Sequence, residues 1–159
     1  MLNLRSSKAL CALALALALA APAGCGGDDD SSSSGGDVAQ YKKEFRAAGK
    51  DRRDAAKDSA AEVTRADDTA GRVQALEGLK GVVTDSVEDF DALEPPKKVQ
   101  ADHDKLVSQF RGMAAGVDAV KNALKSGDPA AAREATQKLQ SAQTAVGKTL
   151  ASIEAKVGR

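Results

Sequence analysis

The sequence has 159 residues, of which 23 are Lys or Arg and 23 are Asp or Glu, so its formal net charge is zero. Nucleic-acid binding needs an excess of positive charge, and we therefore expect no nucleic-acid partner. The chain contains no Trp, one Tyr and three Phe, so few side chains are available to stack on bases or sugars.

The first 24 residues have the pattern of a secretory signal peptide. Arg5 and Lys8 give a basic start, and residues 9–23 are almost entirely Ala and Leu. This apolar run is shorter than the ~20 residues that a bilayer-spanning helix needs. We therefore expect residues 1–24 to be removed on export.

The residues Ala23-Gly24-Cys25 resemble the lipobox of bacterial lipoproteins, and the chain resembles small lipoproteins of actinobacteria in style. This resemblance implies that the thiol of Cys25 is lipidated and that the chain is cut before Cys25. The protein would then be anchored at the outer face of the cytoplasmic membrane. Pro22 stands where a lipobox usually has an aliphatic residue. The alternative is cleavage after Ala21-Pro22-Ala23, which would release a soluble secreted protein.

Residues 25–37 contain the cysteine and a Gly/Asp/Ser-rich stretch, which predicts a flexible tether because it has no apolar side chains to bury. As a flexible coil, 12 residues reach about 19 Å. Cleavage before Cys25 also removes Cys11, which would leave the exported domain without a thiol or a disulfide. A Cys11–Cys25 bridge is the alternative.

Residues 38–159 predict an all-α domain, because apolar residues recur at steps of three and four and no alternating pattern is sustained. The predicted helices cover about 38–66, 69–93, 96–126 and 129–157. The third segment has the clearest stripe: Val99, His103, Leu106, Phe110, Met113, Val117, Val120 and Leu124. The first has the weakest: Val38, Tyr41, Phe45, Ala48, Arg52, Ala55, Ser59 and Val63.

Two of the three helix breaks have strong signals. Pro95-Pro96 must interrupt a helix and can open the next one. The run Gly127-Asp128-Pro129 combines a C-terminal Gly, an N-cap Asp and a Pro at the first helical position. The break near residues 66–71 is weaker, and one bent helix over residues 38–93 is the alternative.

Charge favours two separate, antiparallel helices before Pro95. Residues 38–66 carry 8 basic and 5 acidic side chains, whereas residues 67–94 carry 2 basic and 8 acidic ones. We expect the acidic patch Asp85, Glu88 and Asp89 to face the basic side chains of the first helix. Exposed ion pairs select neighbours more than they stabilise the fold.

Short connections between the helices predict an antiparallel up-down-up-down four-helix bundle. This topology brings the larger side chains to one end: Tyr41, Phe45, Phe90, Leu93, Leu106, Phe110, Leu150 and Ile153. The opposite end has mainly Ala and Val. The bundle must therefore either widen at the end with large side chains or leave a crevice. The pattern Gly112-x-x-x-Gly116 indicates close helix packing.

His103, the only histidine, occupies an inward position of the third segment. We expect a satisfied core histidine, bonded to Tyr41 or to a backbone carbonyl. The flanking residues Asp102 and Asp104 point elsewhere on a helix, so they do not form a metal site with it. No sequence motif for a catalytic nucleophile, a phosphate loop, a calcium loop or covalent haem attachment is present.

The sequence therefore predicts a lipid-anchored, non-catalytic binding or scaffolding module of the cell envelope. It needs no cofactor or metal, and its partners are the membrane and an envelope protein. The alternative is a bundle that binds a small ligand or a metal at the aromatic end, through His103, Tyr41 and Phe110.

Overall fold

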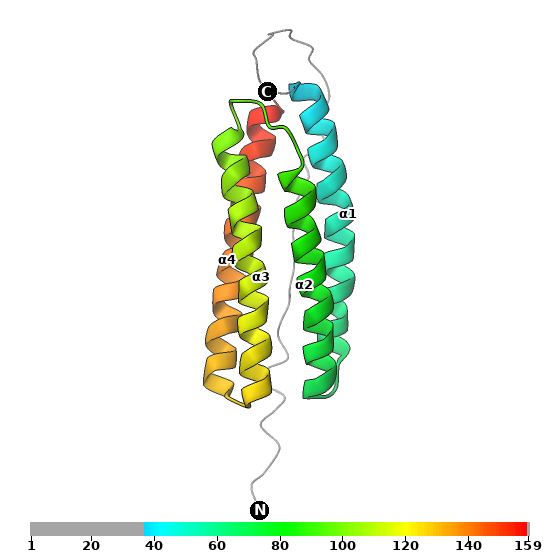
Figure 1. The fold of residues 1–159 in the computed structure, drawn as a ribbon, viewed down its shortest axis with the longest axis vertical. Helices are drawn as coiled ribbons and strands as arrows, with labels where there is room; N and C mark the ends of the chain where they lie inside the picture. The colour runs from blue at the N-terminus through cyan, green and yellow to red at the C-terminus, as the bar shows by residue number, and fades with distance from the viewer. Residues whose placement is uncertain (1–36, 159) are drawn as a thin grey trace, which may run out of the picture.

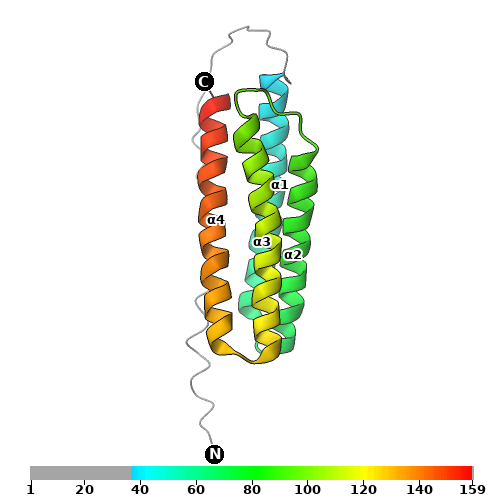
Figure 2. The same cartoon turned by 60° about the vertical axis from the view of Figure 1, so that its left-hand side comes forward.

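The computed structural model describes residues 37–158, which form four α-helices (Figure 1). The helices are α1 (Val38–Arg65), α2 (Thr69–Asp91), α3 (Gln100–Ser126) and α4 (Pro129–Val157). They run alternately up and down, as the two views of Figures 1 and 2 show, so the predicted four-helix bundle is confirmed. Across this part of the chain, no helix is both long and apolar enough to cross a bilayer.

The predicted signal peptide, the lipidation site Cys25 and residues 25–36 of the tether lie outside the described residues. Asp37, the last residue of the predicted tether, belongs to the bundle because its side chain caps α1. Its carboxylate accepts a hydrogen bond from the backbone N–H of Ala39 at 2.8 Å. Such caps satisfy N–H groups that have no partner within the helix.

Asp side chains also cap α2 and α4. Asp68 accepts from the backbone N–H of Gly71 at 2.7 Å, and Asp128 accepts from that of Ala130 at 2.9 Å. Gly127 ends α3 with φ of 69°, a left-handed conformation that costs glycine little. The predicted break at Gly127-Asp128-Pro129 is therefore confirmed.

Residues 66–68 separate α1 from α2, so the alternative of one bent helix is wrong. The start of α3 also differs from the prediction, because the helix begins at Gln100 and not at Pro96. The backbone N–H of Val99 donates to the carbonyl of Pro96 at 2.9 Å, which closes a turn before the helix. The side chain of Val99 is fully buried, so the turn places it in the core.

The aromatic side chains contact one another in a continuous row, which we call the aromatic stack, at the end of the bundle where α1 begins. Neighbouring ring centroids are 5.5 Å apart for Tyr41 and Phe45, 5.3 Å for Phe45 and Phe90, and 5.4 Å for Phe90 and Phe110. This confirms that Phe45 and Phe90 lie together. Aromatic pairs at such distances add packing energy beyond the area that they bury.

The four helices do not contact one another equally. The pairs α1 with α2, α2 with α3 and α3 with α4 pack closely, whereas α1 and α4, the remaining neighbouring pair, make far fewer contacts. The first and last helices of the bundle therefore meet at a loose seam, which we call the α1–α4 seam.

Candidate ligand-binding site

His103 and Tyr41 contact each other inside the core. The Tyr41 hydroxyl lies 2.9 Å from Nδ1 of His103, and His103 also bonds to the backbone of Phe90. Burial lowers the pKa of His103, although Asp104, the bond to Phe90 and Asp91 act in the opposite direction. Burial also raises the pKa of Tyr41. Both side chains are therefore neutral at pH 7, and they satisfy each other.

The structure gives no support to a metal site at this end. Within residues 37–158, no three His, Cys, Asp or Glu side chains are grouped so that they could hold a metal ion. Asp102 instead pairs with Lys156 at 2.8 Å and accepts a hydrogen bond from Ser152 at 2.7 Å, both from α4. Of the three predicted ligand-binding residues, Phe110 alone lines the pocket described next.

A pocket lies inside the bundle, and all four helices contribute to its lining. Phe90 and Phe110, at the inner edge of the aromatic stack, form one side of it. Other apolar side chains continue the lining: Leu79 and Val83 from α2, Val117 from α3, and Leu139 and Val146 from α4. The pocket has a cavity volume of about 50 Å³. It lies next to the large side chains, where the sequence predicted either a wider bundle or a crevice.

Small residues on α1 explain why the pocket exists. Gly49 and Ala56 line it from α1 beside Arg52 and Arg53, whereas most of the lining from the other helices is larger and apolar. A Cβ atom added to Gly49 would meet nothing within 4 Å, so the chain leaves open space beside this residue. Because α1 also packs loosely against α4, neither helix fills the space between them.

Two polar side chains border this apolar pocket from opposite sides of the α1–α4 seam. Arg53 comes from α1 and Gln143 from α4. The Nε atom of Arg53 and the Nε2 atom of Gln143 are buried, and neither has a hydrogen-bond acceptor within residues 37–158. Most buried polar groups in proteins are hydrogen-bonded, and leaving one without a partner costs about 1–3 kcal/mol. Two such donors at one pocket are therefore notable.

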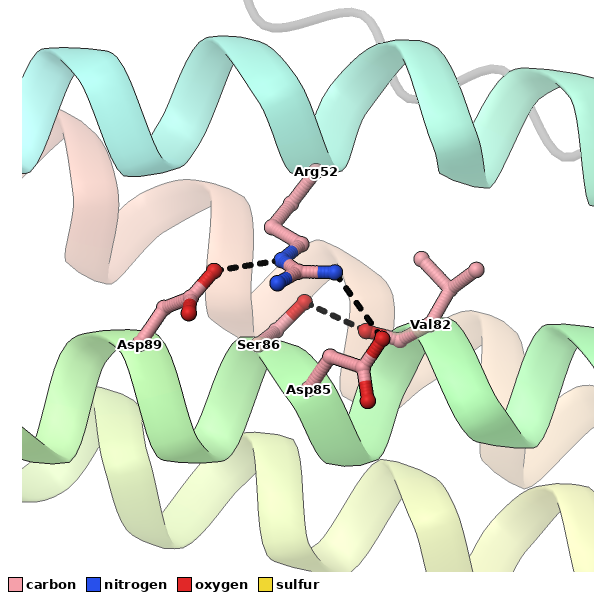
Figure 3. A network of polar contacts seen from close by, with 5 residues as sticks. All are labelled: Arg52, Val82, Asp85, Ser86 and Asp89. Atoms are coloured by element: carbon pink, nitrogen blue, oxygen red, sulfur yellow. Dashed lines mark hydrogen bonds and ion pairs between the residues drawn. The ribbon is translucent and has the colours of Figure 1, made fainter.

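The neighbouring Arg52, which also lines the pocket, is paired with two carboxylates, in contrast to Arg53. Its Nη1 lies 3.0 Å from Asp85 and its Nε lies 2.5 Å from Asp89. Figure 3 draws both contacts between α1 and α2. The hydrogen bond to Asp89 is the largest of the influences that raise the pKa of Arg52. These contacts confirm that the acidic patch of α2 faces the basic side chains of α1.

The hydroxyl of Ser86 also lines the pocket, but it is used within its own helix. Ser86 is 3% exposed and donates to the backbone carbonyl of Val82 at 2.8 Å. This hydrogen bond is also drawn in Figure 3. Hydroxyls that bond back to the preceding turn are common in helices. The free donors at the pocket are therefore those of Arg53 and Gln143.

Sequence reasoning missed Arg53 and Gln143. The inward stripe predicted for the first helix contained Arg52, Ala55 and Ser59, whereas the buried face of α1 includes Ala56 and Ala60. No signal in the sequence singled out Arg53 or Gln143, and Arg53 lines the pocket together with its neighbour Arg52.

Comparison of the chain with protein-family models, with curated proteins and with solved structures gave no match.

Proposed function

We propose that this protein is an exported, lipid-anchored module that binds a small, largely apolar ligand without chemically changing it. The observation that carries the binding function is the pocket within the bundle, which is lined by apolar side chains and bordered by two unpartnered donors. Small-molecule sites commonly combine an apolar lining with a few placed polar groups. The proposed anchor rests on the sequence Ala23-Gly24-Cys25.

The polar groups around the pocket support binding more than catalysis. Arg53 and Gln143 offer N–H donors, and the Ser86 hydroxyl donates to a backbone carbonyl. A catalytic nucleophile needs a base within hydrogen-bond distance. His103, the only histidine of the chain, is bonded to Tyr41 and does not line the pocket.

The anchor is tested by labelling cells with a fatty-acid analogue. We expect label on the natural chain and none on Cys25→Ala. A natural chain that takes up no label and begins at Gly24 would show a soluble secreted protein instead.

The binding function is tested by native mass spectrometry of the full chain after gentle extraction from the membrane. We expect a small molecule to remain bound to the natural chain and to be absent from Gly49→Leu, because the added side chain occupies the pocket. Gly112→Leu is the matched control, since a Cβ there also meets nothing within 4 Å but Gly112 does not line the pocket. Equal occupancy in both variants, or no bound molecule in the natural chain, would contradict the proposal.

A further inference from the structure

The chemistry of the two unpartnered groups indicates what the ligand carries at its polar end. The Nε of Arg53 and the Nε2 of Gln143 are both hydrogen-bond donors, and both belong to residues that line one pocket. The guanidinium group of Arg53 also carries a positive charge. A matching ligand group therefore presents two acceptor oxygens and a negative charge.

We propose that the pocket binds a monocarboxylate with a short hydrocarbon chain. One carboxylate oxygen accepts from the Nε–H of Arg53, and the other accepts from the side-chain amide of Gln143. The hydrocarbon chain lies among Val83, Val117 and Val146. This inference rests on the proposed binding function and names the ligand class for the same pocket.

The charges beside the pocket favour a single negative charge on the ligand. Arg53 supplies one positive charge that no carboxylate within residues 37–158 neutralises. Arg52, one residue earlier, is already shared between Asp85 and Asp89. A dianion such as a phosphate monoester would bring a second negative charge next to these two carboxylates. An amine would leave both donors unpaired and would be repelled by Arg53.

The size of the pocket limits the hydrocarbon chain. An engineered cavity of about 150 Å³ holds benzene, and the cavity here is about 50 Å³. The enclosed space therefore accepts only a few carbon atoms, and a longer chain must extend into the α1–α4 seam. We expect affinity to rise about fourfold for each methylene group until the enclosed space is filled, and more slowly afterwards.

The test is a titration of the full chain, extracted in detergent, with straight-chain carboxylates from propanoate to decanoate. Proton–nitrogen NMR spectra report directly on the Nε–H of Arg53 and on the amide of Gln143. Alcohols and amines of the same chain lengths serve as neutral and cationic probes. We expect both side-chain signals to shift with carboxylates, and binding of the alcohols and amines to be at least tenfold weaker.

Variants assign the effect to the two side chains. We expect Arg53→Gln to weaken carboxylate binding at least tenfold, because hydrogen bonds to charged groups are the stronger kind. Gln143→Leu should weaken it severalfold and should fold readily, since it removes a buried donor that lacks a partner. Arg46→Gln removes a positive charge from an exposed position of α1 outside the pocket. The affinity of this variant for carboxylates should stay within twofold of that of the natural chain.

The outcomes separate the two proposals. Alcohols that bind as tightly as carboxylates, with Arg53→Gln unchanged, would overturn the carboxylate inference and leave the binding function standing. A chain that binds none of the three probe classes would contradict both. Thermal unfolding of each variant shows whether a loss of binding reflects a loss of fold.

Discussion

The two glycines of the Gly112-x-x-x-Gly116 pattern lie on the same helix but in different surroundings, and replacing each by Ala separates backbone effects from packing effects. A Cβ at Gly112 would meet nothing within 4 Å, whereas one at Gly116 would lie 3.2 Å from Cδ1 of Leu139 in α4. Gly116 is therefore the position at which α3 and α4 approach closely. Gly112 is not.

The expected magnitudes follow from these surroundings. Ala is favoured over Gly inside a helix by about 0.8–1.0 kcal/mol, so Gly112→Ala should raise the free energy of unfolding by about that amount. Gly116→Ala has the same backbone gain but must displace Leu139, and overpacking a core costs about 1–3 kcal/mol. The Leu139 side chain borders the pocket and can move by a few tenths of an ångström, so the low end applies. The free energy of unfolding of Gly116→Ala should therefore be close to that of the natural chain.

Urea unfolding followed by circular dichroism measures both free energies. Leu139→Val completes a double-mutant cycle with Gly116→Ala, because the shorter side chain removes the crowding. The two changes should therefore show a coupling energy of about 1 kcal/mol. The reasoning is refuted if Gly116→Ala stabilises the protein as much as Gly112→Ala does, or if the cycle shows no coupling.

Three further predictions concern the core and the caps. Burial lowers the pKa of His103 in the folded state, so on acidification the unfolded chain binds a proton first. The stability that a neutral His103 gives is therefore complete above about pH 6.5 and falls below it. Between pH 7 and 5 the free energy of unfolding should change by up to about 1.4 kcal/mol per pH unit, and His103→Gln should remove this slope. A slope that persists in that variant would show that other titratable groups cause it. Phe90→Ala should lower the free energy of unfolding by about 3–5 kcal/mol, because Phe90 is 1% exposed and lies between two other rings. A loss below about 1 kcal/mol in urea unfolding would contradict this packing. Asp128→Ala should cost about 0.5–2 kcal/mol by removing the cap of α4, and the parallel change to Asn, which still caps, should recover most of that loss in the same assay.

The architecture was predictable from the sequence because helix signals and break signals agreed. In α3 and α4 the apolar stripes recur without interruption, and Gly127-Asp128-Pro129 satisfies three separate preferences at one break. The start of α3 was not predictable in the same way, because Pro is accepted at the first helical position and also before a helix. The burial of Val99, a tertiary contact, decides between these arrangements.

The candidate site was less predictable than the fold. Most small residues of α1 are alanines, and an alanine shows weakly which face of a helix is buried; Ala55 and Ala56 are equivalent in the sequence pattern, although Ala56 is the more buried. The pocket results from side-chain volumes on four helices that are distant in sequence. The sequence left open whether the bundle widens or leaves a crevice at the end with large side chains. The two donors beside the pocket could be found only in three dimensions.

The α1–α4 seam joins the first and last helices, so no loop connects its two sides. A transient separation of α1 from α4 would break few contacts and would leave every helix hydrogen-bonded along its own axis. The pocket could therefore fill and empty by a breathing motion of the folded bundle, and the rate of ligand exchange would be set by the strength of that one interface. Side chains along the seam that never touch a ligand would then control how long it stays bound.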